Sequence, residues 1–108
     1  MKSLLVGTLD GVFKVVKSGS TWKIASQTLR GMEVNALVKR PDKSGTFYGG
    51  VRGGGVYRTD DAGVSWRRLG ENVLSDKIRT LALDPSSPDI VYVGTEPPGL
   101  WKSAQSDG

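Results

Sequence analysis

Apolar and polar residues alternate over short stretches of the chain, and clusters of glycine, proline, aspartate and serine separate these stretches. Such alternation is typical of β-strands that bury one face, and the separating residues favour tight turns. Glycine accounts for 15 of the 108 residues, about twice average usage, which also favours many turns. The pattern predicts strands at Ser3–Thr8, Gly11–Val15, Thr21–Ala25, Glu33–Lys39, Thr46–Val51, Gly55–Thr59, Ser65–Leu69, Lys77–Leu83, Asp89–Thr95 and Gly99–Ser103.

The chain repeats itself at an offset of 44 residues. Segment 11–22 lies without a gap on segment 55–66, and the two share glycines, an aromatic residue, a small hydroxyl residue and a tryptophan at matching places. Segment 34–50 lies in the same way on segment 78–94, and a third copy begins at Gly99. Because a fixed period of this length is the signature of a repeat architecture, the strands must be grouped by repeat.

Each period holds four predicted strands, A to D in chain order. The predicted units are residues 1–29, an incomplete blade with strands B–D; residues 30–73, a complete blade; and residues 74–108, an incomplete blade with strands A–C. Four antiparallel strands in a period of about 40 to 45 residues are typical of a β-propeller blade. The sequence therefore predicts an all-β fold, a partial β-propeller of about 2.5 four-stranded blades. The alternative is a free-standing β-sandwich, although a sandwich does not need a fixed period.

Composition limits the other possibilities. A chain of 108 residues has the size of one domain with a modest core, and the absence of cysteine excludes disulfides and thiolate metal sites. The 15 Lys and Arg residues are scattered among 11 acids, which indicates a solvated surface and no nucleic-acid footprint. The apolar run after the N-terminal methionine is too short for a signal peptide or a membrane span. We therefore expect a cytoplasmic protein with no nucleic-acid or membrane partner.

One stretch carries a specific motif. Thr59, Asp61, Gly63, Ser65 and Trp66 fit the pattern Ser/Thr-x-Asp-x-Gly-x-Ser/Thr-Trp, and here the chain resembles the Asp-box, or bacterial neuraminidase repeat, propellers. That family includes sialidases, the luminal domain of sortilin and photosystem assembly factors. In such a turn the aspartate accepts backbone N–H groups, the glycine takes a positive φ, and the tryptophan anchors the hairpin. The resemblance implies a structural role for these residues, away from the ligand face.

A calcium loop and a catalytic acid are poorer interpretations of this stretch. Calcium needs six to eight oxygen ligands, and only Asp60 and Asp61 are at hand. Lys17 stands in the first repeat where Asp61 stands in the second, and Gln105 takes that place in the third, so only one box is intact. The motif thus predicts the fold and not a reaction, and we expect neither a metal nor a cofactor.

A ligand site is expected on the face of the propeller formed by the B–C and D–A connections. The candidate binding residues there are Arg30, Glu33, Arg52 and Glu96. The run of glycines around Arg52 resembles a phosphate cradle, but no helix and no Lys-Ser/Thr pair follow it. No catalytic residue is assigned.

Two functions follow from these predictions. The first is a non-enzymatic Asp-box propeller fragment that binds a protein or a glycan, or serves as a scaffold. Its exposed end blades would be covered by other copies in a homo-oligomer or by the missing blades of a longer chain. The alternative is the N-terminal part of a sialidase-like glycoside hydrolase, since the resemblance implies an arginine cluster, a Tyr-Glu pair and an Asp acid in such enzymes. The chain has no residue set with that motif, and fold alone does not carry activity.

Overall fold

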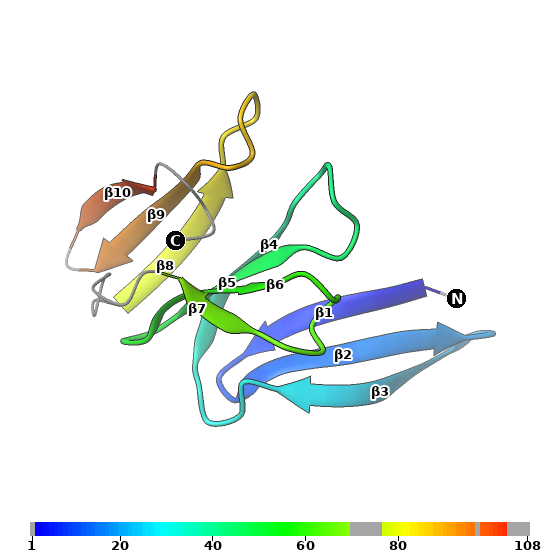
Figure 1. Cartoon of the computed structure of the whole chain (residues 1–108). Coiled ribbons are helices and arrows are strands. Elements are labelled where there is room, and N and C mark those ends of the chain that lie inside the picture. The colour runs from blue at the N-terminus through cyan, green and yellow to red at the C-terminus, as the bar shows by residue number, and fades with distance from the viewer. Residues whose placement is uncertain (1, 70–76, 97, 104–108) are drawn as a thin grey trace.

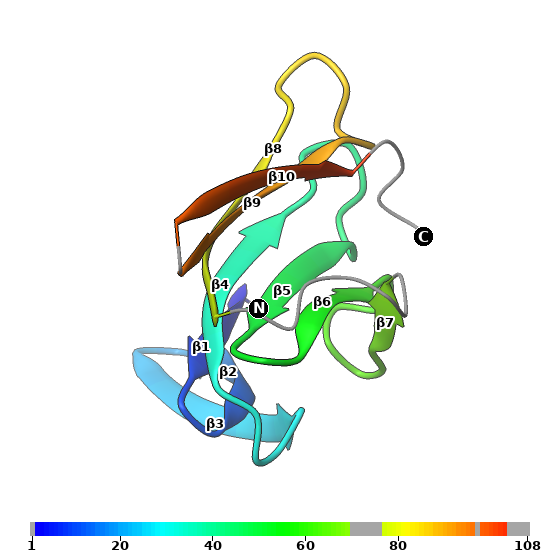
Figure 2. The ribbon, with the colours of Figure 1, turned by 90° about the vertical axis from the view of Figure 1, so that its left-hand side faces the viewer.

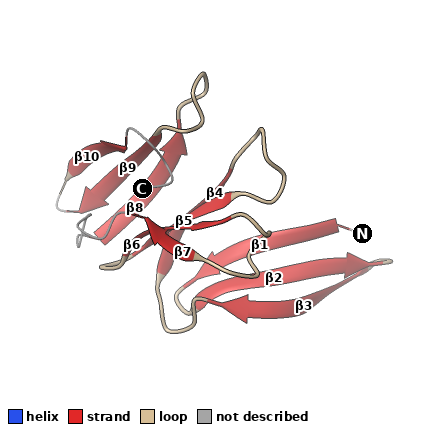
Figure 3. Ribbon diagram, in the orientation of Figure 1, coloured by secondary structure: helices blue, strands red, loops and turns tan. Residues whose placement is uncertain are grey.

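Ten β-strands and the loops between them make up the described part of the protein, which comprises residues 2–69, 77–96 and 98–103 of a computed structural model (Figures 1 and 3). The predicted all-β class is confirmed, because the described residues contain no helix. It follows that no helix among them is long and apolar enough to cross a membrane.

The strands form three antiparallel sheets in chain order. The first sheet contains β1 (Lys2–Thr8), β2 (Gly11–Ser18) and β3 (Thr21–Thr28) in the order β1-β2-β3. The middle sheet contains β4 (Val34–Lys39), β5 (Phe47–Val51), β6 (Gly55–Thr59) and β7 (Arg67–Leu69) in the order β4-β5-β6-β7. The third sheet contains β8 (Lys77–Leu83), β9 (Val91–Glu96) and β10 (Gly99–Ser103) in the order β10-β9-β8. The first and third sheets lie on opposite sides of the middle sheet, as Figures 1 and 2 show.

Strand ends differ from the prediction where local contacts decide them. The β2–β3 hairpin is longer than expected: its pairing extends from Ser18 and Thr21 to Val12 and Thr28, with a register shift between Lys14 and Val15. β7 begins at Arg67 and not at Ser65, since the Ser65 N–H is held by Asp61 in the preceding turn. The boundary that we predict between residues 73 and 74 lies outside the described residues, as does Gln105.

The first hairpin is one residue shorter than its two counterparts. Thr8 pairs with Gly11 across a turn of residues 9 and 10, whereas Val51 pairs with Gly55 across residues 52–54. As a result Gly7 of β1 corresponds to Gly50 of β5, an offset of 43, while the residues from Gly11 onward keep the offset of 44. A one-residue change in register exchanges the two faces of a strand, so this assignment decides which side chains face each neighbour.

One apolar cluster lies between each pair of neighbouring sheets. The first contains Val12, Val34 and Val51 with Leu5, Leu29, Met32, Leu37, Tyr57 and Trp66. The second contains Tyr48, Val56, Leu69, Ile78, Leu81, Val91 and Val93. The sheets thus pack face to face, and the Asn35 amide of β4 donates to the Ile78 carbonyl of β8 at 3.0 Å. Neighbouring sheets therefore contact each other through their first strands as well as through their faces.

Candidate binding surface

Two connections meet at one end of the first two sheets. The backbone N–H of Arg52, after β5, donates to the Glu33 carbonyl at 2.9 Å, and the N–H of Gly11 donates to the Met32 carbonyl at 2.7 Å. The two side chains also approach each other, because Arg52 Nη1 lies 3.5 Å from Glu33 Oε1. Glu33 and Arg52, which the sequence nominates separately, therefore belong to one surface.

The β3–β4 connection has a defined shape. Leu29 and Gly31 have positive φ angles of 51° and 79°, which turn the chain sharply after β3. Asp10 Oδ1 accepts the Gly31 N–H at 2.7 Å, so that the β1–β2 turn supports this connection. The same hydrogen bond lowers the pKa of Asp10. A charged aspartate thus fixes the backbone that leads to Glu33.

An open depression of about 580 Å³ lies between these connections. Its lining consists of residues 31–33, 51–54 and 57. Met32 and Tyr57 supply apolar and aromatic surface, and Glu33 is the one carboxylate among the lining residues. A shallow depression with an aromatic side chain and a solvent-accessible ion pair suits recognition of an extended ligand better than enclosure of a small molecule.

The other two candidate residues lie apart from this depression. Arg30 is exposed on the same β3–β4 connection but is not among the residues that line the depression. Glu96 ends β9 in the third sheet, where its carboxylate accepts from Arg79 Nη1 at 2.8 Å. Met32, Tyr57 and Arg79 are not among the residues predicted from the sequence. The aromatic match between Phe13 and Tyr57 in the repeat was the available signal for Tyr57.

The turn between β6 and β7 is closed by its own side chains. Asp61 Oδ1 accepts the Thr59 hydroxyl at 2.7 Å and the Ser65 N–H at 2.9 Å, and Oδ2 accepts the Ser65 hydroxyl at 2.5 Å. Thr59 Oγ1 in turn accepts the N–H of Gly63, whose φ is 88°. Hydrogen bonds from the Ser65 hydroxyl and N–H, and then from Thr59, hold the pKa of Asp61 far below its usual range. Both carboxylate oxygens are therefore engaged in the turn.

Trp66 joins this turn to the preceding sheet. Its indole Nε1 donates to Thr28 Oγ1 of β3 at 3.0 Å, and its half-buried ring packs with the cluster between the first and middle sheets. Trp22 occupies the matching place in the first sheet, where no preceding sheet exists among the described residues, and it is 45% exposed. The position thus anchors one sheet to the sheet before it.

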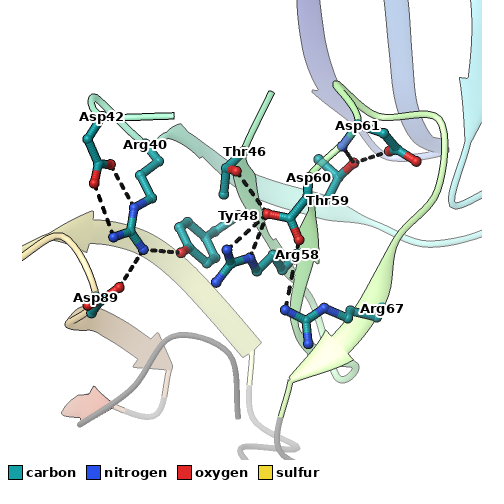
Figure 4. A network of polar contacts seen from close by, with 10 residues as sticks. All are labelled: Arg40, Asp42, Thr46, Tyr48, Arg58, Thr59, Asp60, Asp61, Arg67 and Asp89. Carbon is teal, nitrogen blue, oxygen red and sulfur yellow. Dashed lines mark hydrogen bonds and ion pairs between the residues drawn. The ribbon is translucent and has the colours of Figure 1, made fainter. Parts of the chain in front are cut away.

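A polar network lies along the middle sheet (Figure 4). Arg58, which is 7% exposed, pairs with Asp60 Oδ1 through Nη2 at 2.9 Å and packs against the Tyr48 ring at 5.5 Å. The Thr46 hydroxyl donates to the same carboxylate at 2.8 Å. The Arg58 hydrogen bond is the main reason that the pKa of Asp60 is lowered.

Arg40 continues this network to the third sheet. Its guanidinium, 5% exposed, lies 2.7 Å from Asp42 Oδ1 and 2.7 Å from Asp89 Oδ1, which precedes β9. Nη1 also donates to the Tyr48 hydroxyl at 3.3 Å (Figure 4). A nearly buried arginine thereby connects the middle sheet to the loop of the next sheet.

Metal-ligating groups do not gather anywhere in the described ranges: no three histidine, cysteine, aspartate or glutamate side chains come together there. The acidic residues noted above are instead engaged by arginines, hydroxyls or backbone N–H groups.

The fold is similar to that of a known propeller. A solved structure of YCF48 bound to D1 peptide matches 94% of this chain and 33% of that chain, with a TM-score of 0.65 and 17% sequence identity. This chain thus spans about a third of that protein. No family model and no curated protein match the chain. The likeness confirms the predicted β-propeller fold, and the three sheets correspond to blades of a partial propeller.

Proposed function

We propose that this chain is a non-enzymatic propeller module of the Asp-box type that binds an extended segment of a partner protein. The ligand surface is the depression between the β3–β4 and β5–β6 connections, and the Glu33–Arg52 pair beside Met32 and Tyr57 carries the proposal. A partner's side chains would pack on Tyr57. Its polar groups would replace Glu33 as the partner of Arg52, because the Glu33–Arg52 contact is long at 3.5 Å. The observation that YCF48 is bound to a peptide supports a protein segment over a glycan.

The Asp-box assignment is part of the proposal. Its support is the hydrogen bonding of Asp61 to Thr59 and Ser65, together with the anchoring of Trp66. In this interpretation the box maintains the blade and takes no part in binding. The propeller would be completed by further blades, from other copies or from a longer chain, and its expected location is cytoplasmic.

A hydrolase is the less well supported function. Glycoside hydrolysis commonly needs two carboxyl groups on either side of the bond to be cleaved, and Glu33 is the single carboxylate among the residues that line the depression. Asp61, whose pKa is strongly lowered, lies in the β6–β7 turn with both oxygens engaged. Binding is therefore the function that these residues support best.

The proposal can be tested on peptide and glycan arrays with the full chain. We expect binding to a subset of peptides, and Arg52→Gln should weaken it by about tenfold or more, because a hydrogen bond to a charged group contributes roughly 1.5–3 kcal/mol. Arg79→Gln is the matched control, since Arg79 also pairs with a glutamate but lies in the third sheet. Turnover of a fluorogenic sialoside that Glu33→Gln abolishes would instead establish the hydrolase and refute the proposal.

A further inference from the structure

The first and third sheets each leave one face uncovered. The back face of the first sheet, turned away from the middle sheet, carries Leu4, Val6 and Ile24, which are 53%, 43% and 67% exposed. Cross-strand pairing places Leu4 beside Val15 and Ile24, and Val6 beside Phe13, on this one face. The front face of the third sheet, which is also turned away from the middle sheet, carries Leu100, which is 77% exposed. These two faces lie at opposite ends of the stack of sheets (Figure 1).

One repeat position on the front face of each sheet is buried when a next sheet follows. Val12, Val56 and Leu100 occupy the same place, each opposite a glycine of the neighbouring strand. Val12 is 1% exposed beneath the middle sheet and Val56 is 5% exposed beneath the third sheet, whereas Leu100 is 77% exposed. The front face of the third sheet thus has the same construction as two covered faces and lacks its cover.

The glycines opposite these residues point to the same missing neighbour. A Cβ at Gly50 would lie 2.6 Å from Ile78 Cγ2 of the next sheet, and one at Gly7 would lie 3.0 Å from Val34 Cγ1 of the next sheet. A Cβ at Gly94 would lie 2.8 Å from Thr80 Oγ1, on the adjacent strand of its own sheet, and would meet no atom of another sheet within 4 Å. No other described sheet approaches the third glycine, so this face is open to a further sheet.

The back face of the first sheet is the complementary half. Leu4 and Val6 correspond to Val91 and Val93, because Gly7 corresponds to Gly94 in the same hairpin position. Val91 and Val93 are 2% and 5% exposed against the middle sheet, while Leu4 and Val6 are about half-exposed. The positions that the third sheet buries against the middle sheet are thus also apolar on the back face of the first sheet, where they are exposed.

Charges favour a second copy of this chain as the cover. Between the middle and third sheets, Arg40 after β4 contacts Asp89 before β9 at 2.7 Å. Asp84 stands after β8 where Arg40 stands after β4, and Lys2 stands in β1 where Asp89 stands before β9. At these two positions the middle and third sheets pair Arg40 with Asp89, whereas the open faces carry Asp84 and Lys2, so the signs of charge are exchanged. Asp84 and Lys2 would face each other if the back face of one chain packed on the front face of another. Arg40 and Asp84 even make matching contacts, to the hydroxyls of Tyr48 and Tyr92.

We infer that a second copy of this chain packs the back face of its first sheet on the front face of the third sheet, head to tail. Leu4, Val6 and Ile24 of the second copy would cover Leu100, and Lys2 of the second copy would lie near Asp84. Such a contact joins two different surfaces, so it must close into a ring or extend without limit. In this packing each sheet, of three or four strands, forms a separate blade. Two copies then make six blades, whereas three copies would make nine, more than the roughly four to eight blades of typical propellers. The inference names the partner that completes the proposed ring.

The first test is the mass of the full chain in solution by size-exclusion chromatography with light scattering. We expect twice the chain mass of 11.6 kDa. Leu100→Glu and Ile24→Glu should each give a monomer, because each places a charge in one half of the contact. Val64→Glu, at a residue that is 70% exposed in the β6–β7 turn, is the matched control and should stay dimeric. A wild-type chain with the mass of a monomer, or with the mass of a trimer or another larger closed oligomer, would overturn the inference.

Mixing the two variants tests the head-to-tail arrangement itself. The Leu100→Glu chain keeps an intact back face and the Ile24→Glu chain keeps an intact front face. An equimolar mixture should therefore give the dimer mass at sufficient concentration, joined by one intact contact, while the second contact of the ring carries both substitutions. A mixture that stays monomeric, or a single variant that remains dimeric on its own, would refute the arrangement. Far-UV circular dichroism of each variant checks that it has folded, as expected for substitutions at exposed positions.

The charge pair supplies a second measurement. Because the closed dimer contains this pair twice, Lys2→Gln and Asp84→Asn should each raise the dissociation constant by about two- to thirtyfold at low salt, and the double variant should be no weaker than either single one. Additive effects would refute the pairing of these two residues.

The mass is measured without ligand, so this measurement separates the inference from the proposed function. A monomer that binds peptides contradicts only the inference, and a dimer that binds none contradicts only the proposed function.

Discussion

Replacing Trp66 with alanine should destabilise the protein far more than the same replacement at Trp22. Full removal of a buried tryptophan typically costs about 3–5 kcal/mol, and a hydrogen bond contributes about 0.5–1.5 kcal/mol of that. Trp66 is half-buried against the first sheet and donates to Thr28 Oγ1 at 3.0 Å, so we expect Trp66→Ala to cost about 2–4 kcal/mol. Trp22 is 45% exposed with Lys17 at 5.9 Å from its ring centre, so we expect Trp22→Ala to cost about 1 kcal/mol.

The comparison is made by urea unfolding followed by far-UV circular dichroism, because removing a tryptophan alters the fluorescence signal. Both variants are built on Leu100→Glu, which keeps the back face of the first sheet free of a second copy, so that the measurement reports on one chain. A difference of this size would also separate the midpoints of thermal unfolding by roughly 5–20 °C. Equal losses at the two positions, or a loss below about 1 kcal/mol at Trp66, would refute the view that Trp66 anchors one sheet to another.

Three further predictions rest on single contacts. Gly50→Ala should cost about 1–3 kcal/mol in urea unfolding, because the new Cβ would lie 2.6 Å from Ile78 Cγ2 in a packed interface; unchanged stability would contradict that packing. Asp61 has a folded-state pKa below its unfolded value of about 3.9, so it adds stability above about pH 4 that is lost as the pH falls. Asp61→Asn should therefore flatten the acid limb of the stability profile, and an unchanged limb would exclude Asp61 as its source. Thr28→Val and Trp66→Phe should show a coupling energy of about 0.5–1.5 kcal/mol, and a coupling near zero would show that their hydrogen bond contributes nothing.

The repeat makes most of the fold predictable because it specifies strands, turns and their spacing together. Gly11 and Gly55 begin the third strand of a unit with φ angles of 82° and 86°, and few other residues adopt such angles. Strand ends are less predictable, since they depend on contacts with residues outside the strand. Ser65 is the clearest case: its sequence context favours a strand, but the Asp61 carboxylate holds its N–H in the turn.

The candidate site was predictable only in part. Charged residues in the connections on one side of a propeller can be picked from sequence, and Glu33 and Arg52 do meet there. Which of them meet depends on the path of each connection, which backbone hydrogen bonds such as Arg52 N to the Glu33 carbonyl determine. The contact of Glu96 could not be predicted, because its partner Arg79 lies on a neighbouring strand and no local sequence pattern pairs the two residues.

The single residue missing from the first hairpin explains why the open faces are recognisable at all. At the uniform offset of 44, Leu5 would correspond to Gly49, and β1 would present the opposite face to the middle sheet. The shorter turn instead makes Leu5 correspond to Tyr48, and Leu5 packs between the first and middle sheets as Tyr48 packs between the middle and third. Leu4 and Val6 are then left on the back face, at positions that are buried in the third sheet. Their exposure follows from the absence of a neighbouring sheet on that face among the described residues and not from an irregular strand, which is why a further sheet of the same kind fits there.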